Sequence, residues 1–237
     1  MNSPIQAVVL AGGFGTRLGE RTQSLPKPMM DIGGRPFLDY LIRSLKRHGI
    51  GDLVLSVGHL HHTISQCFGD GSDFGVRINY VVEKEPLGTG GAVRRCLSLL
   101  AERFFVLNGD TLFDVNFAAL AATSDTNVMA LRSVTDAGRY GRVEVEGKWI
   151  THFEEKGESG PGTINGGVLC LNRVEIAGMA EGRASLEHDL LPRLAEERRI
   201  AAFISDAFFI DIGLPQSLVE AQTAIPRWER SQCKRNG

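Results

Sequence analysis

The first residues in the sequence that could do chemistry form a glycine-rich loop after an apolar run, in the stretch VVLAGGFGTRLG that begins at Val8. Gly12, Gly13 and Gly15 carry no Cβ, so the backbone N–H groups of this loop can approach an anion closely. Arg17 adds a planar fork of donors that matches phosphate oxygens. We interpret the loop as a polyphosphate-binding loop, and a solvated turn with a surface arginine is the simpler alternative.

A lysine between two prolines follows the loop and helps to separate the alternatives. Lys27 lies between Pro26 and Pro28, whose fixed φ angles stiffen the segment and hold the ammonium group in place. A dinucleotide-binding loop of the Rossmann type opens directly into a helix and is followed, about 20 residues later, by an acidic ribose ligand. Here the prolines break that helix, and the absence of G-K-[ST] excludes a Walker loop. The segment therefore favours a different kind of phosphate cradle.

Two aspartates follow apolar runs and could bind a divalent cation. Asp110 ends the run RFFVLNGD, and Asp211 lies in FFIDIG, between an apolar run and a glycine turn. Ligands of open α/β folds bind at the carboxyl ends of the parallel strands, and Mg²⁺ prefers the hard oxygens of carboxylates. Either residue alone could equally form a turn or cap a helix.

The elements that must position these residues alternate between short apolar strands and amphipathic helices in the first half of the chain. This alternation predicts βαβ units and a parallel sheet. One helix should begin at Pro36 and end at Gly49. From about Val128 the strands follow one another closely, with a hairpin turn at Glu146 and Gly147. We therefore expect a doubly wound α/β fold with a mixed, mainly parallel sheet and a small antiparallel region.

Length and composition are those of an ordinary globular protein. The chain has 237 residues, of which 43% are hydrophobic and 23% are charged, and this is ample for a well-packed core. We expect one domain over residues 1–225 and a flexible tail over 226–237, because the final stretch PRWERSQCKRNG is basic and polar. A net charge of −2 gives no overall field that would recruit nucleic acid or an anionic membrane.

The N-terminal stretch, the cysteines and the histidines show no pattern that indicates a signal peptide, a disulfide framework or a metal site. The stretch MNSPIQAVVLAGG lacks the basic and long apolar regions of a signal peptide, so we expect a cytoplasmic protein. The four cysteines form no C-x-x-C pair, which argues against zinc or a disulfide framework, and we expect Cys67, Cys96 and Cys170 in the core. The histidines of HLHH, residues 59–62, have no cysteine or acidic partner at ligand spacing nearby, so a polar helix start is favoured over a metal site.

Seven motifs in order give the chain a resemblance to a known family. LAGGFGTRL and LPKPM are followed by EKEPLGTGGA, LNGD, FEEK, INGG and FIDIG, from residue 5 to about residue 220. Together they resemble the signature of the sugar-1-phosphate nucleotidyltransferases. Within that family the pattern is most similar to the compact guanylyltransferases that act on a heptose 1-phosphate and supply surface polysaccharide synthesis.

The resemblance implies a reaction in which a sugar-phosphate oxygen attacks the α-phosphorus of GTP and pyrophosphate leaves. It implies Mg²⁺ as the cofactor, held by Asp110 and Asp211. Arg17, Lys27 and Asp110 are the implied catalytic residues. The implied nucleotide-binding residues are Leu10, Ala11, Gly12, Gly13, Gly15, Thr16, Arg17, Lys27, Glu83, Pro86 and Gly88. The implied sugar-phosphate-binding residues are Gly109, Glu155, Lys156, Asn165 and Gly166.

The base and the sugar remain the least constrained parts of this interpretation. A carboxylate at Glu83 could accept from guanine N1–H and the N2 amino group, although uracil also offers one N–H and an exposed glutamate at a strand end is the simpler alternative. Asp114, Glu154 and Arg139 could equally enter the sugar pocket. Mannose 1-phosphate guanylyltransferase, a uridylyltransferase for an N-acetylated sugar and a noncatalytic nucleotide-sugar-binding regulator stay open as alternatives. A homodimer is also open.

Overall fold

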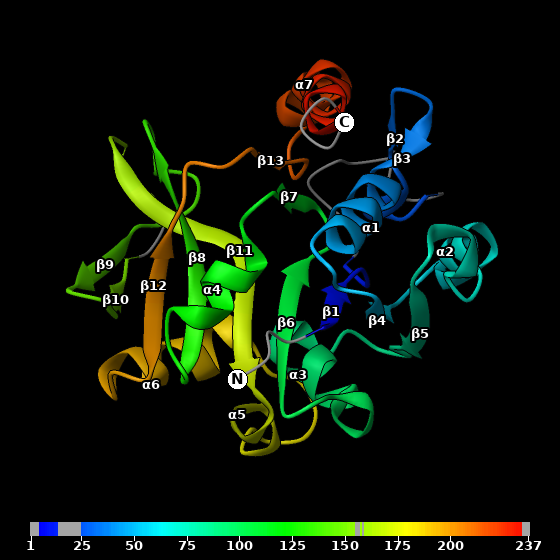
Figure 1. Ribbon diagram of the computed structural model, residues 1–237. Coiled ribbons are helices and arrows are strands. Elements are labelled where there is room, and N and C mark those ends of the chain that lie inside the picture. The colour runs from blue at the N-terminus through cyan, green and yellow to red at the C-terminus, as the bar shows by residue number, and fades with distance from the viewer. Residues whose placement is uncertain (1–4, 14–24, 155–156, 158, 234–237) are drawn as a thin grey trace.

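A computed structural model describes residues 5–13, 25–154, 157 and 159–233, and Figure 1 gives the labels of its elements. The strands are β1 (Gln6–Leu10), β2 (Asp31–Ile32), β3 (Arg35–Pro36), β4 (Asp52–Val57), β5 (Arg77–Val82), β6 (Arg103–Asn108), β7 (Thr111–Phe113), β8 (Asn127–Val134), β9 (Val143–Glu146), β10 (Trp149–Phe153), β11 (Gly162–Asn172), β12 (Ile200–Ile204) and β13 (Phe209–Asp211). The helices are α1 (Phe37–Arg47), α2 (His61–Phe68), α3 (Gly88–Arg95), α4 (Phe117–Ala122), α5 (Arg173–Ala177), α6 (Leu191–Glu196) and α7 (Pro215–Cys233). Short 3₁₀ turns span Lys27–Met29, Ser72–Phe74 and Leu97–Leu99, and a π-helical turn spans Leu186–Leu190.

Within the described residues, the central sheet has nine strands in the order β5-β4-β1-β6-β11-β8-β12-β10-β9. The first four strands of that order are parallel to one another. β11 runs antiparallel to β6 and β8, and β12 is parallel to β8. The expected doubly wound α/β fold is therefore confirmed. The antiparallel region is the second half of the same sheet, which the spacing of the strands did not indicate.

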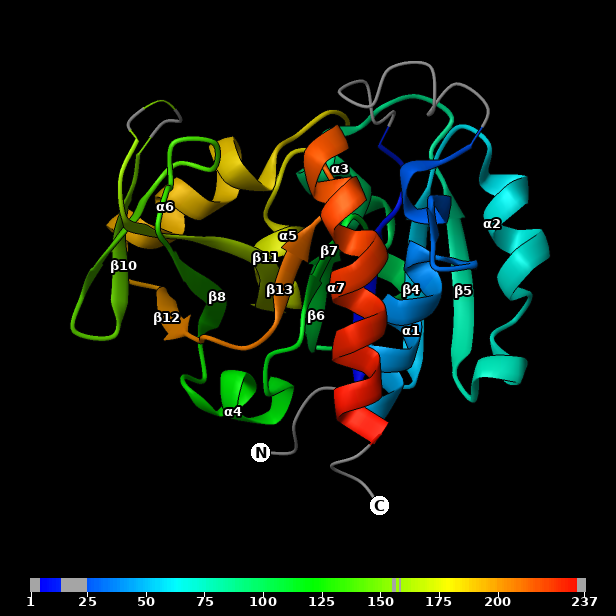
Figure 2. The ribbon, with the colours of Figure 1, turned by 90° about the horizontal axis from the view of Figure 1, so that it is seen from above.

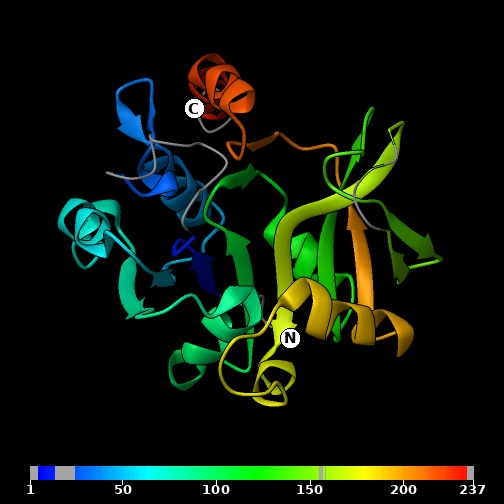
Figure 3. The ribbon, with the colours of Figure 1, turned by 180° about the vertical axis from the view of Figure 1, so that it is seen from behind.

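Two hydrophobic cores cover the two faces of the sheet. Side chains alternate along each strand, so Ala7 and Val9 pack into one core while Val8 packs into the other. The first core also holds the apolar sides of α1, α2, α4 and α7, and the second holds those of α3, α5 and α6. Figure 2 shows α6 on one side of β8 and β12 and α4 on the other, and Figure 3 shows the α3, α5 and α6 side.

A small second sheet brings distant segments together at one end of the large sheet. β13 pairs antiparallel with β7, with Asp211 opposite Thr111. The N–H of Ile212 donates to the carbonyl of Asp110 at 2.9 Å. β12, which precedes β13 along the chain, instead enters the large sheet beside β8. The consequence is that the two candidate metal ligands become neighbours.

Residues 226–233 belong to α7 rather than to the flexible tail that we predicted over 226–237, and residues 234–237 lie outside the described residues. α7 continues to Cys233 with Pro226 inside it, and Figure 2 shows it alongside α1. Trp228 is only 5% exposed, stacks on Phe208 and donates from its indole nitrogen to Asp114 at 3.0 Å. Tertiary packing of this aromatic side chain outweighs the polar composition of the segment.

The prediction that Cys67 lies in the core is wrong, because this residue is exposed, whereas Cys96 and Cys170 are buried as predicted.

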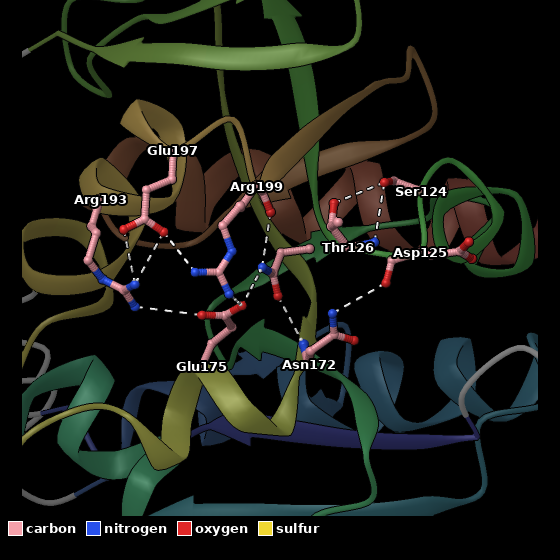
Figure 4. Close-up of polar contacts among 9 residues, drawn as sticks. Ser124, Asp125, Thr126, Asn172, Glu175, Arg193, Glu197 and Arg199 are labelled. Carbon is pink, nitrogen blue, oxygen red and sulfur yellow. Dashed lines mark hydrogen bonds and ion pairs between the residues drawn. The ribbon is translucent and has the colours of Figure 1, made fainter.

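A buried glutamate joins α5, α6 and the edge of the sheet that lies opposite the carboxyl ends of the parallel strands (Figure 4). Glu175 is 4% exposed and accepts from the guanidinium of Arg199 and from Asn127 Nδ2, the latter at 3.2 Å. Arg193 Nη2 lies 3.6 Å from its other oxygen. At this edge Asn172 pairs in register with Arg103, the first residue of β6. The cluster therefore stabilises the end of the sheet that is far from Asp110, which follows the last residue of β6.

Glu175→Gln should destabilise the protein without changing its chemistry. The neutral amide weakens a charge-assisted pair and must turn one N–H₂ group toward the arginines, at a cost of about 1 to 3 kcal/mol in the free energy of unfolding. Urea unfolding measures the loss. Glu197→Gln, which changes an exposed acid of the same cluster (Figure 4), should barely move the midpoint. Equal midpoints for the two variants would contradict the structural role of Glu175.

Candidate active site

A cleft of about 500 Å³ opens at the carboxyl ends of β1 and β6. Ten of the residues predicted from the sequence line it: Leu10, Ala11, Gly12, Gly13, Lys27, Glu83, Pro86, Gly88, Gly109 and Asp110. Five further lining residues were not predicted: Pro28, Thr89, Ala92, Asn108 and Glu187. The predictions for Gly15, Thr16, Arg17, Glu155 and Lys156 lie outside the described residues.

An ion pair marks one end of the cleft. Lys27, in a 3₁₀ turn that begins after Pro26, places Nζ 2.5 Å from Asp110 Oδ2. The lysine side chain is 13% exposed and that of the aspartate is 30% exposed, so both groups lie at the border between protein and cleft. A lysine so placed provides a compact positive charge for a phosphate group, while the carboxylate keeps it fixed when no phosphate is bound.

Asp211 lies next to this pair although it does not line the same cleft. A Cβ added to Gly213 would lie 2.6 Å from Asp211 Oδ1 and 3.4 Å from Lys27 Nζ, so both side chains contact one glycine. Asp211 also accepts from Arg139 Nη2 at 3.1 Å and from the N–H of Gly213 at 2.5 Å. The register of β7 and β13 thus gathers two carboxylates and two cations at one edge.

The chemistry of the two aspartates fits the ligands that a magnesium ion prefers. Mg²⁺ in phosphate-transfer sites takes one or two carboxylates and completes its shell with water and phosphate oxygens. Asp110 and Asp211 supply hard oxygens of this type from neighbouring strands. Within the described residues no group of three His, Cys, Asp or Glu side chains lies close enough together to hold a metal ion.

Tyr140 lies beside the aspartates and stays neutral. Burial, followed by the negative charge of Asp211, raises the pKa of its hydroxyl to about 12. Its ring lies under the guanidinium of Arg139 at 4.4 Å. A phenol with this pKa is uncharged near neutral pH, so Tyr140 adds no negative charge beside Asp211.

The other end of the cleft is organised around Glu83. Its Oε1 accepts from the hydroxyl of Ser56 at 3.0 Å, and its Oε2 accepts from the N–H of Leu87 at 3.2 Å. Ser56 is fully buried, so this hydroxyl is a fixed support. A Cβ on Gly12 would lie 2.6 Å from Glu83 Oε1, so this glycine is required for the close approach of the carboxylate. Each oxygen keeps a lone pair, because a carboxylate can accept about four hydrogen bonds.

Gly109 brings the two strands at the floor of the cleft together. Its N–H donates to the carbonyl of Leu10 at 3.0 Å, and a Cβ would lie 2.6 Å from that oxygen. Asn165 and Gly166 do not line the cleft. Asn165 Oδ1 accepts from the N–H of Gly167 at 2.8 Å, and Gly166 packs against the ring of Phe113. Their predicted contact with a sugar phosphate therefore has no support in the lining of this cleft.

Asp114, one of the open choices for the sugar pocket, points elsewhere. It binds Ser44, His48 and Trp228 at 3.0 to 3.1 Å. Burial alone would raise the pKa of Asp114, but the hydrogen bonds from His48 and Trp228 outweigh it and hold the pKa below its usual value. Asp114 is thus an anchor for α7. Of the other two choices, Arg139 reaches Asp211, and Glu154 lies 3.7 Å from Arg142.

Comparisons with known proteins agree with this geometry. The family model described as Nucleotidyl transferase matches residues 6–227. The D-glycero-α-D-manno-heptose 1-phosphate guanylyltransferase of Campylobacter jejuni is 37% identical, over 90% of this chain and 96% of the relative. The enzyme of the same name from Aneurinibacillus thermoaerophilus is 37% identical, over 94% of this chain and 100% of the relative.

A solved structure is similar over the same length. HddC from Yersinia pseudotuberculosis, complexed with GMP-PN, superimposes with a TM-score of 0.83 and 32% identity, covering 92% of this chain and 97% of HddC. Within the described residues of our chain, no helix is long and apolar enough to cross a membrane. The match of the family model to residues 6–227, which is nearly the whole chain, shows that the chain belongs to the nucleotidyl transferase family.

Proposed function

We propose that the protein transfers GMP from GTP to D-glycero-α-D-manno-heptose 1-phosphate and releases pyrophosphate. The observation that carries the proposal is the similarity over almost the full length of both chains to two relatives with this name. The geometry supports it, since the cleft pairs a cationic end at Lys27 with a carboxylate at Glu83. We further propose that the reaction takes place in the cytoplasm, where GTP is available, and serves surface polysaccharide synthesis.

The proposed reaction does not need a general base. A phosphate oxygen of the sugar phosphate forms a bond to the α-phosphorus of GTP, and the bond from that phosphorus to the bridging oxygen of pyrophosphate breaks. The nucleophile already carries negative charge near neutral pH, because the second pKa of a phosphate monoester is about 6. The protein must therefore align two polyanions and reduce their repulsion.

The residues at the cationic end divide this task. Lys27 exchanges its contact with Asp110 for a contact with phosphate, which frees the carboxylate. When bound, Mg²⁺ would be held by Asp110 and Asp211 and would neutralise charge on the phosphates. For Arg17 and Lys156 we propose contacts with the triphosphate and with the sugar phosphate, respectively, on the basis of the sequence.

At the other end we propose that Glu83 reads guanine. Its two oxygens are oriented by Ser56 and Leu87, and the remaining lone pairs suit the adjacent N1–H and N2 amino donors of the base. A carboxylate that is already held in place by Ser56 and Leu87 binds a pair of donors more tightly than a mobile side chain would. Its conformational entropy has been lost before the base binds.

Glu83→Gln should lower the preference for GTP about tenfold or more. The amide can direct only its carbonyl oxygen at the base, so a charge-assisted hydrogen bond worth about 1.5 to 3 kcal/mol is weakened or lost. Competition kinetics with GTP and inosine triphosphate measure the effect, because inosine lacks the N2 amino group. Glu85→Gln, which changes an acid outside this cleft, is the control. Unchanged discrimination against inosine triphosphate after Glu83→Gln would remove Glu83 from base recognition.

The experiment that tests the proposed function is a matrix of nucleoside triphosphates against sugar 1-phosphates, scored by pyrophosphate release with added Mg²⁺. The triphosphates are GTP, ATP, UTP and dTTP, and the acceptors are the heptose, mannose, glucose and N-acetylglucosamine 1-phosphates. We expect the highest kcat/KM for GTP with the heptose. A higher kcat/KM with mannose 1-phosphate would mean that mannose 1-phosphate, not the heptose, is the acceptor. A higher kcat/KM with UTP would overturn the proposal.

A further inference from the structure

Glu187 is an acidic residue of the cleft that has no role in the chemistry above. It lies in the π-helical turn Leu186–Leu190 and lines the same cleft as Lys27 and Glu83. The hydroxyl of Thr89 donates to its Oε2 at 2.5 Å, and the hydroxyl of Ser185 donates to the same oxygen at 2.9 Å. Two donors on one oxygen fix the orientation of an otherwise exposed side chain.

The segment that carries Glu187 is docked firmly on the start of α3. Ala184 accepts from the N–H groups of Gly90 and Gly91 and donates its own N–H to the carbonyl of Leu87 at 2.8 Å. The N–H of Leu186 donates to the hydroxyl of Thr89 at 2.8 Å. That hydroxyl has a single proton, which it gives to Glu187. The carboxylate is therefore held in a prearranged position rather than on a mobile loop.

The second oxygen of this carboxylate is not engaged by any residue that the structure describes. Among the described residues, Oε1 of Glu187 has no hydrogen-bond partner, and no cation lies within ion-pair distance of the side chain. A carboxylate that is not paired with a cation of the described residues repels phosphate groups, so a neutral part of the substrates suits this position. It can only accept hydrogen bonds, which restricts its ligand to a group with N–H or O–H donors.

We infer that Glu187 determines specificity by accepting hydrogen bonds from the ring hydroxyls of a sugar. This inference rests on the proposed function, in which Glu83 takes the N–H donors of guanine and leaves hydroxyls as the remaining neutral donors. The hydroxyls belong either to the ribose of the nucleotide or to the acceptor sugar, and the chemistry of recognition is the same. Thr89 and Ser185 orient the acid and do not contact the substrate through the protons that they donate to Glu187.

Glu187→Gln tests the inference with little change in shape. The amide oxygen can still accept from Thr89 and Ser185, while the N–H₂ group replaces the free acceptor in the cleft. The control is Asp189→Asn in the same turn, since Asp189 accepts from the N–H of Ser185 at 2.7 Å but does not line the cleft. Calorimetry measures binding of GTP, 2′-deoxy-GTP, 3′-deoxy-GTP and each sugar 1-phosphate, and steady-state kinetics measure KM and kcat.

The two sources of the hydroxyls give different results. If Glu187 binds the ribose, Glu187→Gln should weaken GTP about tenfold and one of the deoxy nucleotides much less, with an unchanged KM for the acceptor. If it binds the acceptor, GTP binding should stay unchanged while KM for the sugar phosphate rises about tenfold. Binding and kinetics equal to those of Asp189→Asn in every case would overturn the inference.

Failure of the proposed function would be recognised separately. If the unaltered protein turned over no pair of substrates, the assigned reaction would be wrong. Calorimetry on the same proteins would still decide the role of Glu187: weaker binding of GTP or of a sugar phosphate by Glu187→Gln alone supports it, and identical binding by all three proteins rejects it.

Discussion

Asp110→Asn is expected to reduce pyrophosphate release at least about a thousandfold, which corresponds to about 4 kcal/mol in the activation free energy. The neutral amide is a poor ligand for Mg²⁺, and it also loses the 2.5 Å ion pair with Lys27. The melting temperature should hardly change, because the carboxylate is 30% exposed at the mouth of the cleft and a surface ion pair adds little stability. Activity and thermal melting together therefore separate a chemical role from a structural one.

The control for this variant is an acid of similar chemistry outside the cleft. Asp206 forms an ion pair with Arg132 at 3.1 Å and its side chain is 85% exposed. Asp206→Asn should leave kcat/KM unchanged. Near-normal turnover by Asp110→Asn, or an equal loss in Asp110→Asn and Asp206→Asn, would exclude the proposed metal-binding role of Asp110.

The parts of the site that the sequence predicts are those that follow a strand directly along the chain. Gly12 and Gly13 come after β1, Asp110 after β6 and Glu83 after β5, and each run of apolar residues marks where its strand ends. Because parallel strands end at one edge of a sheet, a correct reading of the strands already gathers these residues. Local pattern was sufficient for this half of the site.

The parts that it does not predict depend on contacts between distant segments. Glu187 reaches the cleft through Thr89, which is 98 residues earlier in the chain, and a glutamate in a polar stretch before a helix carries no local signal of that contact. Asn165 stays a prediction. Its motif matches the family, a bulge in β11 lies between Asn165 and Val168, and its Oδ1 accepts from the N–H of Gly167.

The C-terminal helix illustrates how packing can override composition. Pro226 and the polar residues around it suggest the end of a helix, but Pro226 lies against Gly33, and Trp228 fills a site between Phe208 and the guanidinium of Arg47. The free energy from burying one indole ring exceeds that of several weak local preferences. An isolated aromatic residue in a polar tail was the available signal.

Lys27→Met is expected to lower kcat/KM about a hundredfold or more, because it removes the positive charge and keeps most of the side-chain volume. The lysine is 13% exposed and faces the phosphate end of the cleft, so its charge acts in a partly desolvated setting where it is strongest. Steady-state kinetics with GTP measure the loss. Lys148→Met is the control, because Lys148 lies over the ring of Trp149 and does not line the cleft.

Combining Lys27→Met with Asp110→Asn tests whether the ion pair works as one unit. If the two residues act on the same phosphates, the double variant should be hardly worse than Asp110→Asn alone, since effects within one catalytic unit are strongly non-additive. Independent roles would instead multiply the two losses, to about a hundred-thousandfold. A double variant that shows the full product would mean that the two residues act independently, and a Lys27→Met enzyme as active as Lys148→Met would mean that the charge of Lys27 takes no part in the reaction.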